Sequence, residues 1–115
     1  MADFIYHLCR AGDWHDGRTR GAYGAALLRT GSGFLHFSTA ATVRDSARLH
    51  CASWQDLVLL KVATAPLGAA LRWEPSRDGR LFPHLYRTLD PAHVVRWWTL
   101  RDGLGRTDHF PDEID

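Results

Sequence analysis

One short segment restricts the fold of this chain more than any other. Residues 57–62 read Leu-Val-Leu-Leu-Lys-Val, an almost uninterrupted apolar run. A strand with one face in water alternates between apolar and polar residues, whereas a run of this length without alternation is typical of a strand buried on both faces. We therefore expect this segment to lie at the centre of a β-sheet.

Other segments are rich in aromatic and β-branched residues, which favours extended chain. These predicted strands are Asp3–Cys9, Gly33–Phe37, Leu71–Glu74, Leu81–Tyr86 and His93–Leu100. Pro83 lies inside the fourth of them. Because proline cannot donate a backbone hydrogen bond to a neighbouring strand, we expect that strand at an edge of the sheet, or Pro83 where its pairing begins.

Two helices are predicted. The first begins at Asp13, which we expect to cap it, and ends near Arg20 before Gly21. The second follows Ser38 or Thr39 as its cap and extends to about residue 52. Its apolar residues recur at helical spacing and form one stripe: Ala40, Val43, Ala47 and Cys51.

The order of these elements indicates an α+β fold. Helices and strands alternate first and strands follow, so we expect a small mixed β-sheet with two short helices. A chain of 115 residues, 45% of them apolar, is the size of one domain with a real core. We expect this domain to span residues 1–115, with 101–115 as a glycine-rich turn and a partly frayed acidic tail.

Composition excludes several classes of protein. The 14 basic and 13 acidic residues nearly cancel, so no broad nucleic-acid-binding surface is expected. No apolar stretch approaches the roughly 20 residues that cross a membrane, and no signal peptide is visible. Cys9 and Cys51 lack a C-x-x-C spacing, so we expect both to be reduced and buried. These features predict a cytoplasmic protein.

Common enzyme motifs are absent from the sequence. It contains neither G-x-G-x-x-G nor G-x-x-x-x-G-K-[ST], the glycine-rich patterns that hold nucleotide phosphates. It also lacks H-E-x-x-H and G-x-S-x-G, which disfavours the familiar zinc proteases and α/β-hydrolases.

Three histidines, His7, His36 and His84, lie in apolar or aromatic parts of predicted strands. Imidazole titrates near neutral pH, exchanges hydrogen bonds and ligates metals. If the strands are neighbours, the three side chains can line one cleft that holds a polar substrate or moves protons. The alternatives are core histidines bonded to backbone carbonyls, or a zinc site. No metal-ligand spacing is present, so we expect no metal. The remaining histidines are interpreted as surface residues: His15, His50, His93 and His109.

Glu74 lies between Trp73 and Pro75. A carboxyl group beside an indole can have a raised pKa, which suits a general acid or base, and the alternative is a solvated strand end. Aromatic side chains on the predicted strands either stack on the ring of a ligand or belong to the core. These are Tyr6, Phe34, Trp73 and Tyr86.

The blocks around these residues resemble a bacterial family of small stand-alone proteins, catalogued as domain of unknown function 952. They occur in order over almost the whole chain: Ile5-Tyr6-His7, Asp13-Trp14, Gly33-Phe34-Leu35-His36-Phe37-Ser38-Thr39, Asp56-Leu57-Val58-Leu59-Leu60, Arg72-Trp73-Glu74 and Leu81-Phe82-Pro83-His84-Leu85-Tyr86. The resemblance also implies that Ala22–Thr30 is extended, although its local propensity favours helix.

This family is grouped by resemblance with the ADP-ribosyltransferase-like proteins, which include the NAD-dependent RNA 2′-phosphotransferases. The resemblance implies an ADP-ribosyltransferase-like fold and NAD or an ADP-ribose-like ligand. His7 matches the first-strand residue that binds the ribose on the nicotinamide side. Ser38-Thr39 resembles the start of a Ser-Thr-Ser strand motif, from which Ala40 departs, and Glu74 is the candidate for a late-strand glutamate.

Two hypotheses for function follow. The first is an NAD-dependent ADP-ribosyl- or phosphotransferase acting on a nucleotide-like small molecule. Its expected catalytic residues are His7, His36, Glu74 and His84, and its expected ligand-binding residues are Tyr6, Phe34, Ser38, Thr39, Trp73 and Tyr86. The second hypothesis is a non-catalytic small-ligand or protein-interaction module of the same fold.

Overall fold

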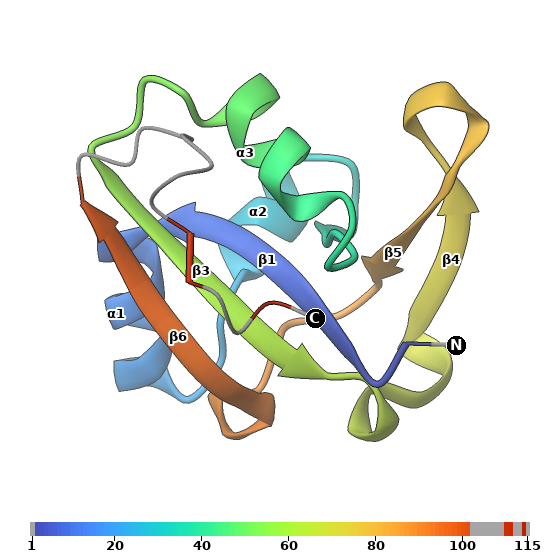
Figure 1. Ribbon diagram of the computed structural model, residues 1–115. Helices are drawn as coiled ribbons and strands as arrows, with labels where there is room; N and C mark the ends of the chain where they lie inside the picture. Colours follow the sequence, from blue (N-terminus) through green and yellow to red (C-terminus); the bar gives the residue numbers. More distant parts are fainter. Residues whose placement is uncertain (1, 102–109, 112–113, 115) are drawn as a thin grey trace.

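The computed structural model describes residues 2–101, 110–111 and 114, and its strands form two three-stranded sheets (Figure 1). In the first sheet, β3 (Asp56–Ala63) lies between β1 (Phe4–Arg10) and β6 (Val94–Arg101). The predicted central strand is therefore confirmed.

In the second sheet, β5 (Leu81–Leu85) lies between β2 (Leu35–His36) and β4 (Leu71–Pro75). Every pair of neighbouring strands in both sheets runs antiparallel, so the α+β class is confirmed but the mixed sheet is wrong. The early alternation of helices and strands suggested parallel crossovers, but the chain that leaves β1 joins a different sheet at β2.

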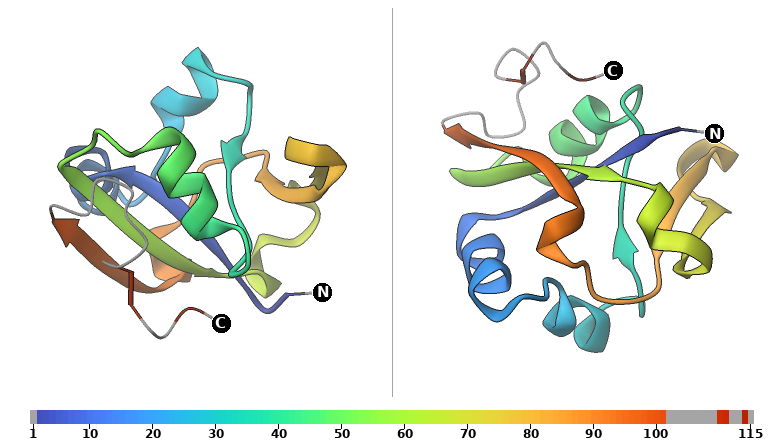
Figure 2. Two further views of the ribbon diagram at one scale, coloured as in Figure 1. Left: turned by 45° about the horizontal axis from the view of Figure 1, so that its top comes forward. Right: turned by 90° about the horizontal axis from the view of Figure 1, so that it is seen from below.

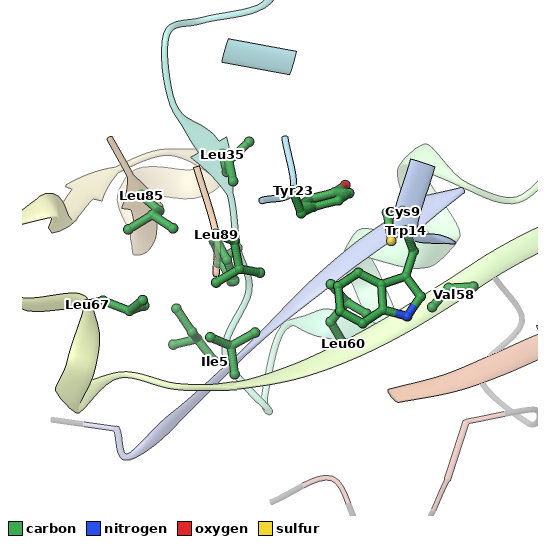
Figure 3. Close-up of a cluster of buried hydrophobic side chains, with 12 residues drawn as sticks. Ile5, Cys9, Trp14, Tyr23, Leu35, Val58, Leu60, Leu67, Leu85 and Leu89 are labelled. Carbon is green, nitrogen blue, oxygen red and sulfur yellow. The ribbon is translucent and has the colours of Figure 1, made fainter. Parts of the chain in front are cut away.

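Both faces of the first sheet are buried, which explains the uninterrupted apolar run in β3. Figure 2 (right) shows α3 on one side of this sheet and α1 and α2 on the other. Leu57 and Leu59 pack with Val43 and Ala47 of α3. Residues of the opposite face form the larger cluster drawn in Figure 3, which includes Ile5, Trp14, Tyr23, Val58, Leu60 and Leu85.

The described residues form three α-helices rather than the two predicted. α1 (Ala11–Arg20) ends at Gly21, whose φ of 78° suits glycine, as predicted. It begins two residues before Asp13, which lies in the first turn and is not the cap.

α3 (Val43–His50) begins later than its predicted cap at Ser38 or Thr39. The carbonyl of Thr39 accepts hydrogen bonds from the backbone N–H groups of Thr42 and Val43, so a tight turn precedes the helix. The predicted apolar stripe is confirmed. Its residues Val43, Ala47 and Cys51 are buried, and Ala40 packs against them.

α2 (Ala25–Thr30) is a helix, so the extended chain implied by the resemblance is wrong and the local propensity is right. Gly24 precedes this helix with a φ of 99°, which a residue with a side chain rarely adopts. A Cβ atom at Gly24 would lie 2.7 Å from Leu35 Cδ2, so glycine lets the helix begin close against β2.

Pro83 lies in the central strand of the second sheet, so the predicted edge is wrong, whereas the pairing of β5 with β2 begins at Pro83, in line with the other predicted position. Its carbonyl accepts a 3.0 Å hydrogen bond from Phe37 N. The return bond of an antiparallel pair would need an N–H that proline lacks, so the ladder with β2 does not extend before Pro83. This explains how a proline fits a central strand: its partner is two residues long.

Three short 3₁₀ segments complete the described elements: η1 (Ala65–Ala70), η2 (Arg77–Gly79) and η3 (Pro91–His93). Most of the predicted tail lies outside the described residues. Phe110 and Ile114 are described, and both pack against the cluster that contains α3. Cys9 and Cys51 are buried and unbonded to each other, as predicted. Within the described chain, no helix is long and apolar enough to cross a membrane.

Candidate functional site

Polar and aromatic side chains gather on one face of the second sheet. Alternation along β5 turns Leu85 into the hydrophobic core and His84 to the opposite face. His84 is paired with His36 of β2 on one side and with Arg72 of β4 on the other. Residues directly opposite one another in a sheet share a face, so His36, His84 and Arg72 form a row across all three strands. We call this the basic row.

Aromatic rings pack against the histidines of the basic row. The rings of His36 and His84 lie 5.5 Å apart between centroids, at an interplanar angle of 72°. Phe34, two residues before His36, stacks on His84 at 4.1 Å and contacts His36 at 4.6 Å. Because of these contacts, the two imidazoles occupy defined positions next to each other.

Glu74 fixes the orientation of His84. Its Oε1 accepts a 2.8 Å hydrogen bond from His84 Nδ1 and a 2.7 Å bond from the Tyr86 hydroxyl. These bonds, that from Tyr86 first, hold the pKa of Glu74 below its usual value. Arg72 completes the arrangement, with its guanidinium carbon 4.7 Å from the centre of the Tyr86 ring. A carboxylate accepts, so His84 carries its proton on Nδ1 and leaves Nε2 for another partner.

His36 is more exposed than His84 and carries no side-chain hydrogen bond to the described residues. Its pKa is lowered, first by partial burial and then by repulsion from His84 and His50. The neutral imidazole of His36 is thus favoured near neutral pH, and a neutral imidazole can accept a proton.

His7 is held from both sides in the interior. Its Nδ1 donates a 2.6 Å hydrogen bond to the carbonyl of His36, because a carbonyl can only accept. Its Nε2 accepts a 2.7 Å bond from the Tyr23 hydroxyl, which also shares a hydrogen bond with the Cys9 thiol. Burial lowers the pKa of His7 to about 4, so the ring is neutral. His7 therefore positions the backbone of His36.

A cavity of about 540 Å³ lies beside the basic row. It opens where β1 and β2 separate, because the two strands are joined only by the bridge between Tyr6 and Ser38 and by the bond from His7 to His36. The Ser38 hydroxyl donates to Ser46 of α3 at 2.8 Å, which closes the cavity on that side.

The structure brings together many of the predicted site residues. The cavity wall contains His7, Phe34, His36, Ser38 and His84. Glu74 and Tyr86 join this group through their hydrogen bonds.

The other three predicted site residues lie apart from the cavity wall. Tyr6 is fully buried against α3, and Trp73 packs against the larger hydrophobic cluster. Thr39 exchanges a hydrogen bond with Thr42 in the turn before α3.

Sequence reasoning missed several residues of this site. Arg72 precedes Glu74 by two positions, so the strand alternation that places one on this face also places the other, and this signal was available. His50 is exposed, as predicted, and it also lines the cavity with Ser46 and Trp54. Their contribution depends on how α3 packs, which no local pattern indicates.

The described part of the chain contains no set of side chains for the zinc site considered as an alternative. No three His, Cys, Asp or Glu side chains there are arranged to hold a metal ion. Both ring nitrogens of His7 are engaged in hydrogen bonds, which removes it from such a set.

The fold and site define a small α+β protein with a histidine-lined cavity at the junction of two antiparallel sheets. The sequence profile described as protein of unknown function (DUF952) matches residues 8–97, so the chain belongs to the DUF952 family.

Solved structures of protein CC0527 from Caulobacter crescentus are similar to this chain. The X-ray structure is 35% identical over 84% of this chain and 85% of that one, with a TM-score of 0.77. The solution NMR structure is 34% identical over 95% of this chain and 97% of that one, with a TM-score of 0.78. Comparison with curated proteins gives no significant match.

Proposed function

We propose that this protein binds a nucleotide-like small molecule, of the NAD or ADP-ribose type, in the cavity beside the basic row. The observation that carries this proposal is the register of His36, His84 and Arg72 across three strands, of which His36 and His84 line that cavity. Guanidinium groups bind phosphate oxygens through two parallel N–H bonds, and imidazole N–H groups can donate further hydrogen bonds to them.

The cavity wall supports recognition of the remaining parts of such a ligand. Its volume of about 540 Å³ lies within the range of small-molecule sites. Phe34 and Trp54 offer aromatic surface to a base or nicotinamide ring, and the hydroxyls of Ser38 and Ser46 can bond to ribose. In this arrangement Glu74 does not contact the ligand but orients the His84 ring that does.

Binding is tested by following the histidine ring signals in NMR titrations with NAD and ADP-ribose. We expect the signals of His36 and His84 to shift together and those of His15, on α1, to stay unchanged. Arg72→Ala should weaken binding about tenfold or more, because it removes a charged hydrogen-bond donor. Arg20→Ala is the matched control, since Arg20 pairs with Asp16 on the exposed side of α1. Unchanged histidine signals with both ligands would contradict the proposal.

One observation favours the non-catalytic alternative within this proposal. Glu74 already accepts two hydrogen bonds through Oε1, from His84 and Tyr86, and so differs from a glutamate free to contact a ribose. Released nicotinamide in the NAD sample would identify a transferase. Binding of NAD without release would identify a ligand-binding module.

A further inference from the structure

We propose that the basic row opens nucleoside 2′,3′-cyclic phosphates to monoesters by general acid–base catalysis. This inference rests on the nucleotide binding proposed above and adds a reaction and a substrate class to it.

The two imidazoles of the row have opposite surroundings. His84 Nδ1 donates a hydrogen bond to the Glu74 carboxylate, which fixes the ring and leaves Nε2 for a ligand. His36 carries no side-chain hydrogen bond to the described residues, and its pKa is lowered, first by partial burial and then by His84 and His50. An imidazole held by a carboxylate beside a second, neutral imidazole can supply a general acid and a general base.

His84 is 6% exposed and lines the cavity. Its Nδ1 is held by Glu74 and its Nε2 has no hydrogen-bond partner among the described residues, so Nε2 is the nitrogen left for a ligand. Both His36 and His84 line the cavity, with their ring centroids 5.5 Å apart. One substrate can therefore contact both rings.

Hydrolysis of a phosphodiester needs these two roles at once, because one oxygen loses a proton as another gains one. It also needs a cation near the non-bridging oxygens, where charge accumulates. Arg72 lies opposite His84 on β4, outside the cavity wall, and its long side chain is the cation that we assign to this role. A nucleoside 2′,3′-cyclic phosphate is small enough for a cavity of about 540 Å³ and needs no extended basic surface.

The step balances without any other reactant than water. His36 accepts a proton from a water molecule as its oxygen forms a bond to phosphorus. The bond from phosphorus to the 2′ oxygen breaks, and His84 Nε2 donates its proton to that oxygen. The product is a nucleoside 3′-monophosphate, and solvent returns the proton from His36 to His84.

The pH dependence follows from the groups that face the two rings. His36 is faced by His84 from β5, by His50 from the end of α3 and by His7 from β1. His84 is faced by Glu74 and Arg72 from β4 and by His36 from β2. Turnover should fall toward acidic pH, because protonated His36 can no longer accept a proton from the attacking water molecule.

The experiment follows adenosine 2′,3′-cyclic phosphate by ³¹P NMR with the full chain. We expect conversion to the 3′-monophosphate, with a loss of about 100-fold or more in His36→Ala and in His84→Gln. His36 is exposed, so its replacement should leave the fold intact, as a thermal unfolding curve will check. His15→Ala, an exposed position on α1, is the matched control and should keep full activity. It is purified in the same way, which accounts for any contaminating nuclease.

Glu74→Gln tests the positioning role of the carboxylate. It should lower kcat with little change in KM, because the His84 ring loses the carboxylate that orients it. A merely structural role would lower the thermal unfolding temperature without this split between kcat and KM.

Two outcomes would overturn the inference, and they separate it from the proposal on which it rests. If adenosine 3′-monophosphate shifts the His36 and His84 signals but the cyclic phosphate is not opened, the reaction is wrong and nucleotide binding stands. If neither these two nucleotides nor NAD and ADP-ribose shift these signals, both proposals fail.

Discussion

The two histidines nearest the junction of the sheets differ in role although both are neutral near pH 7. His7 is 5% exposed, and both of its ring nitrogens are bonded within the protein. His36 presents its ring to the cavity and receives the bond from His7 on its backbone carbonyl. The interior histidine therefore holds the backbone of His36 in place, and it is itself a buried group that resists protonation.

This burial predicts that the protein loses stability in acid. The pKa of His7 is about 4 in the fold against an ordinary value of 6.5, so the unfolded chain binds more protons between these limits. The free energy of unfolding should fall as the pH drops below 6.5, by about 3 kcal/mol in total once the pH is below 4. Urea unfolding at pH 7.5 and pH 5 measures the change. His7→Asn should be less stable at pH 7.5 but lose most of this pH dependence, and an equal dependence in both proteins would refute the assignment.

The Tyr23 hydroxyl is expected to matter for the same buried group. Tyr23→Phe leaves His7 Nε2 buried without a donor, which should cost about 1–3 kcal/mol of unfolding free energy. Tyr86→Phe is the matched control. It also removes a tyrosine hydroxyl, but from an exposed bond to Glu74, so it should cost about 0.5 kcal/mol or less. Equal costs in urea unfolding would show that the bond to His7 contributes nothing.

At the level of elements, sequence patterns succeeded where one local rule governed the outcome. The apolar run of β3 and the stripe from Val43 to Cys51 each depend on which faces are covered, and both appear as predicted. The predicted edge position of the strand that contains Pro83 is wrong, because the rule against proline in central strands assumes long partner strands and β2 is two residues long. The extended chain implied for Ala22–Thr30 is also wrong, because the local helix propensity of this segment determines its structure.

At Gly24, which precedes α2, we expect one added methyl group to reduce the stability of the protein strongly. In Gly24→Ala, the new Cβ would lie 2.7 Å from Leu35 Cδ2 at a φ of 99°, so the protein should lose about 1–3 kcal/mol of stability. Gly12→Ala is the control, since Gly12 lies in α1 with nothing within 4 Å of an added methyl group, and alanine should stabilise the helix by up to about 1 kcal/mol. Thermal unfolding of the two variants should move in opposite directions. Similar shifts would mean that Gly24 is not under steric constraint.

Over the whole molecule, the site depends on contacts between residues far apart in the chain. The candidate histidines can be recognised in the sequence as polar residues within apolar strands. Which of them lie opposite one another cannot be recognised there, because β2, β4 and β5 come together only in the folded sheet. The alternation of β4 places Arg72 on the same face as Glu74, but its position opposite His84 is visible only in the folded sheet. Conversely, Tyr6 and Trp73 resemble ligand-stacking residues in sequence, and only packing reveals that they belong to the two hydrophobic clusters.

The cavity lies between β1, the second sheet and α3, so a ligand that fills it should stabilise the whole fold. A nucleotide at about one hundred times its Kd should raise the free energy of unfolding by about 2.7 kcal/mol, because it binds only the folded chain. Urea unfolding with and without adenosine 3′-monophosphate measures this increase. Arg72→Ala should lose most of the increase at the same concentration, whereas Arg20→Ala, altered only on the exposed side of α1, should keep it. If both variants respond as the natural chain does, the nucleotide binds away from the basic row.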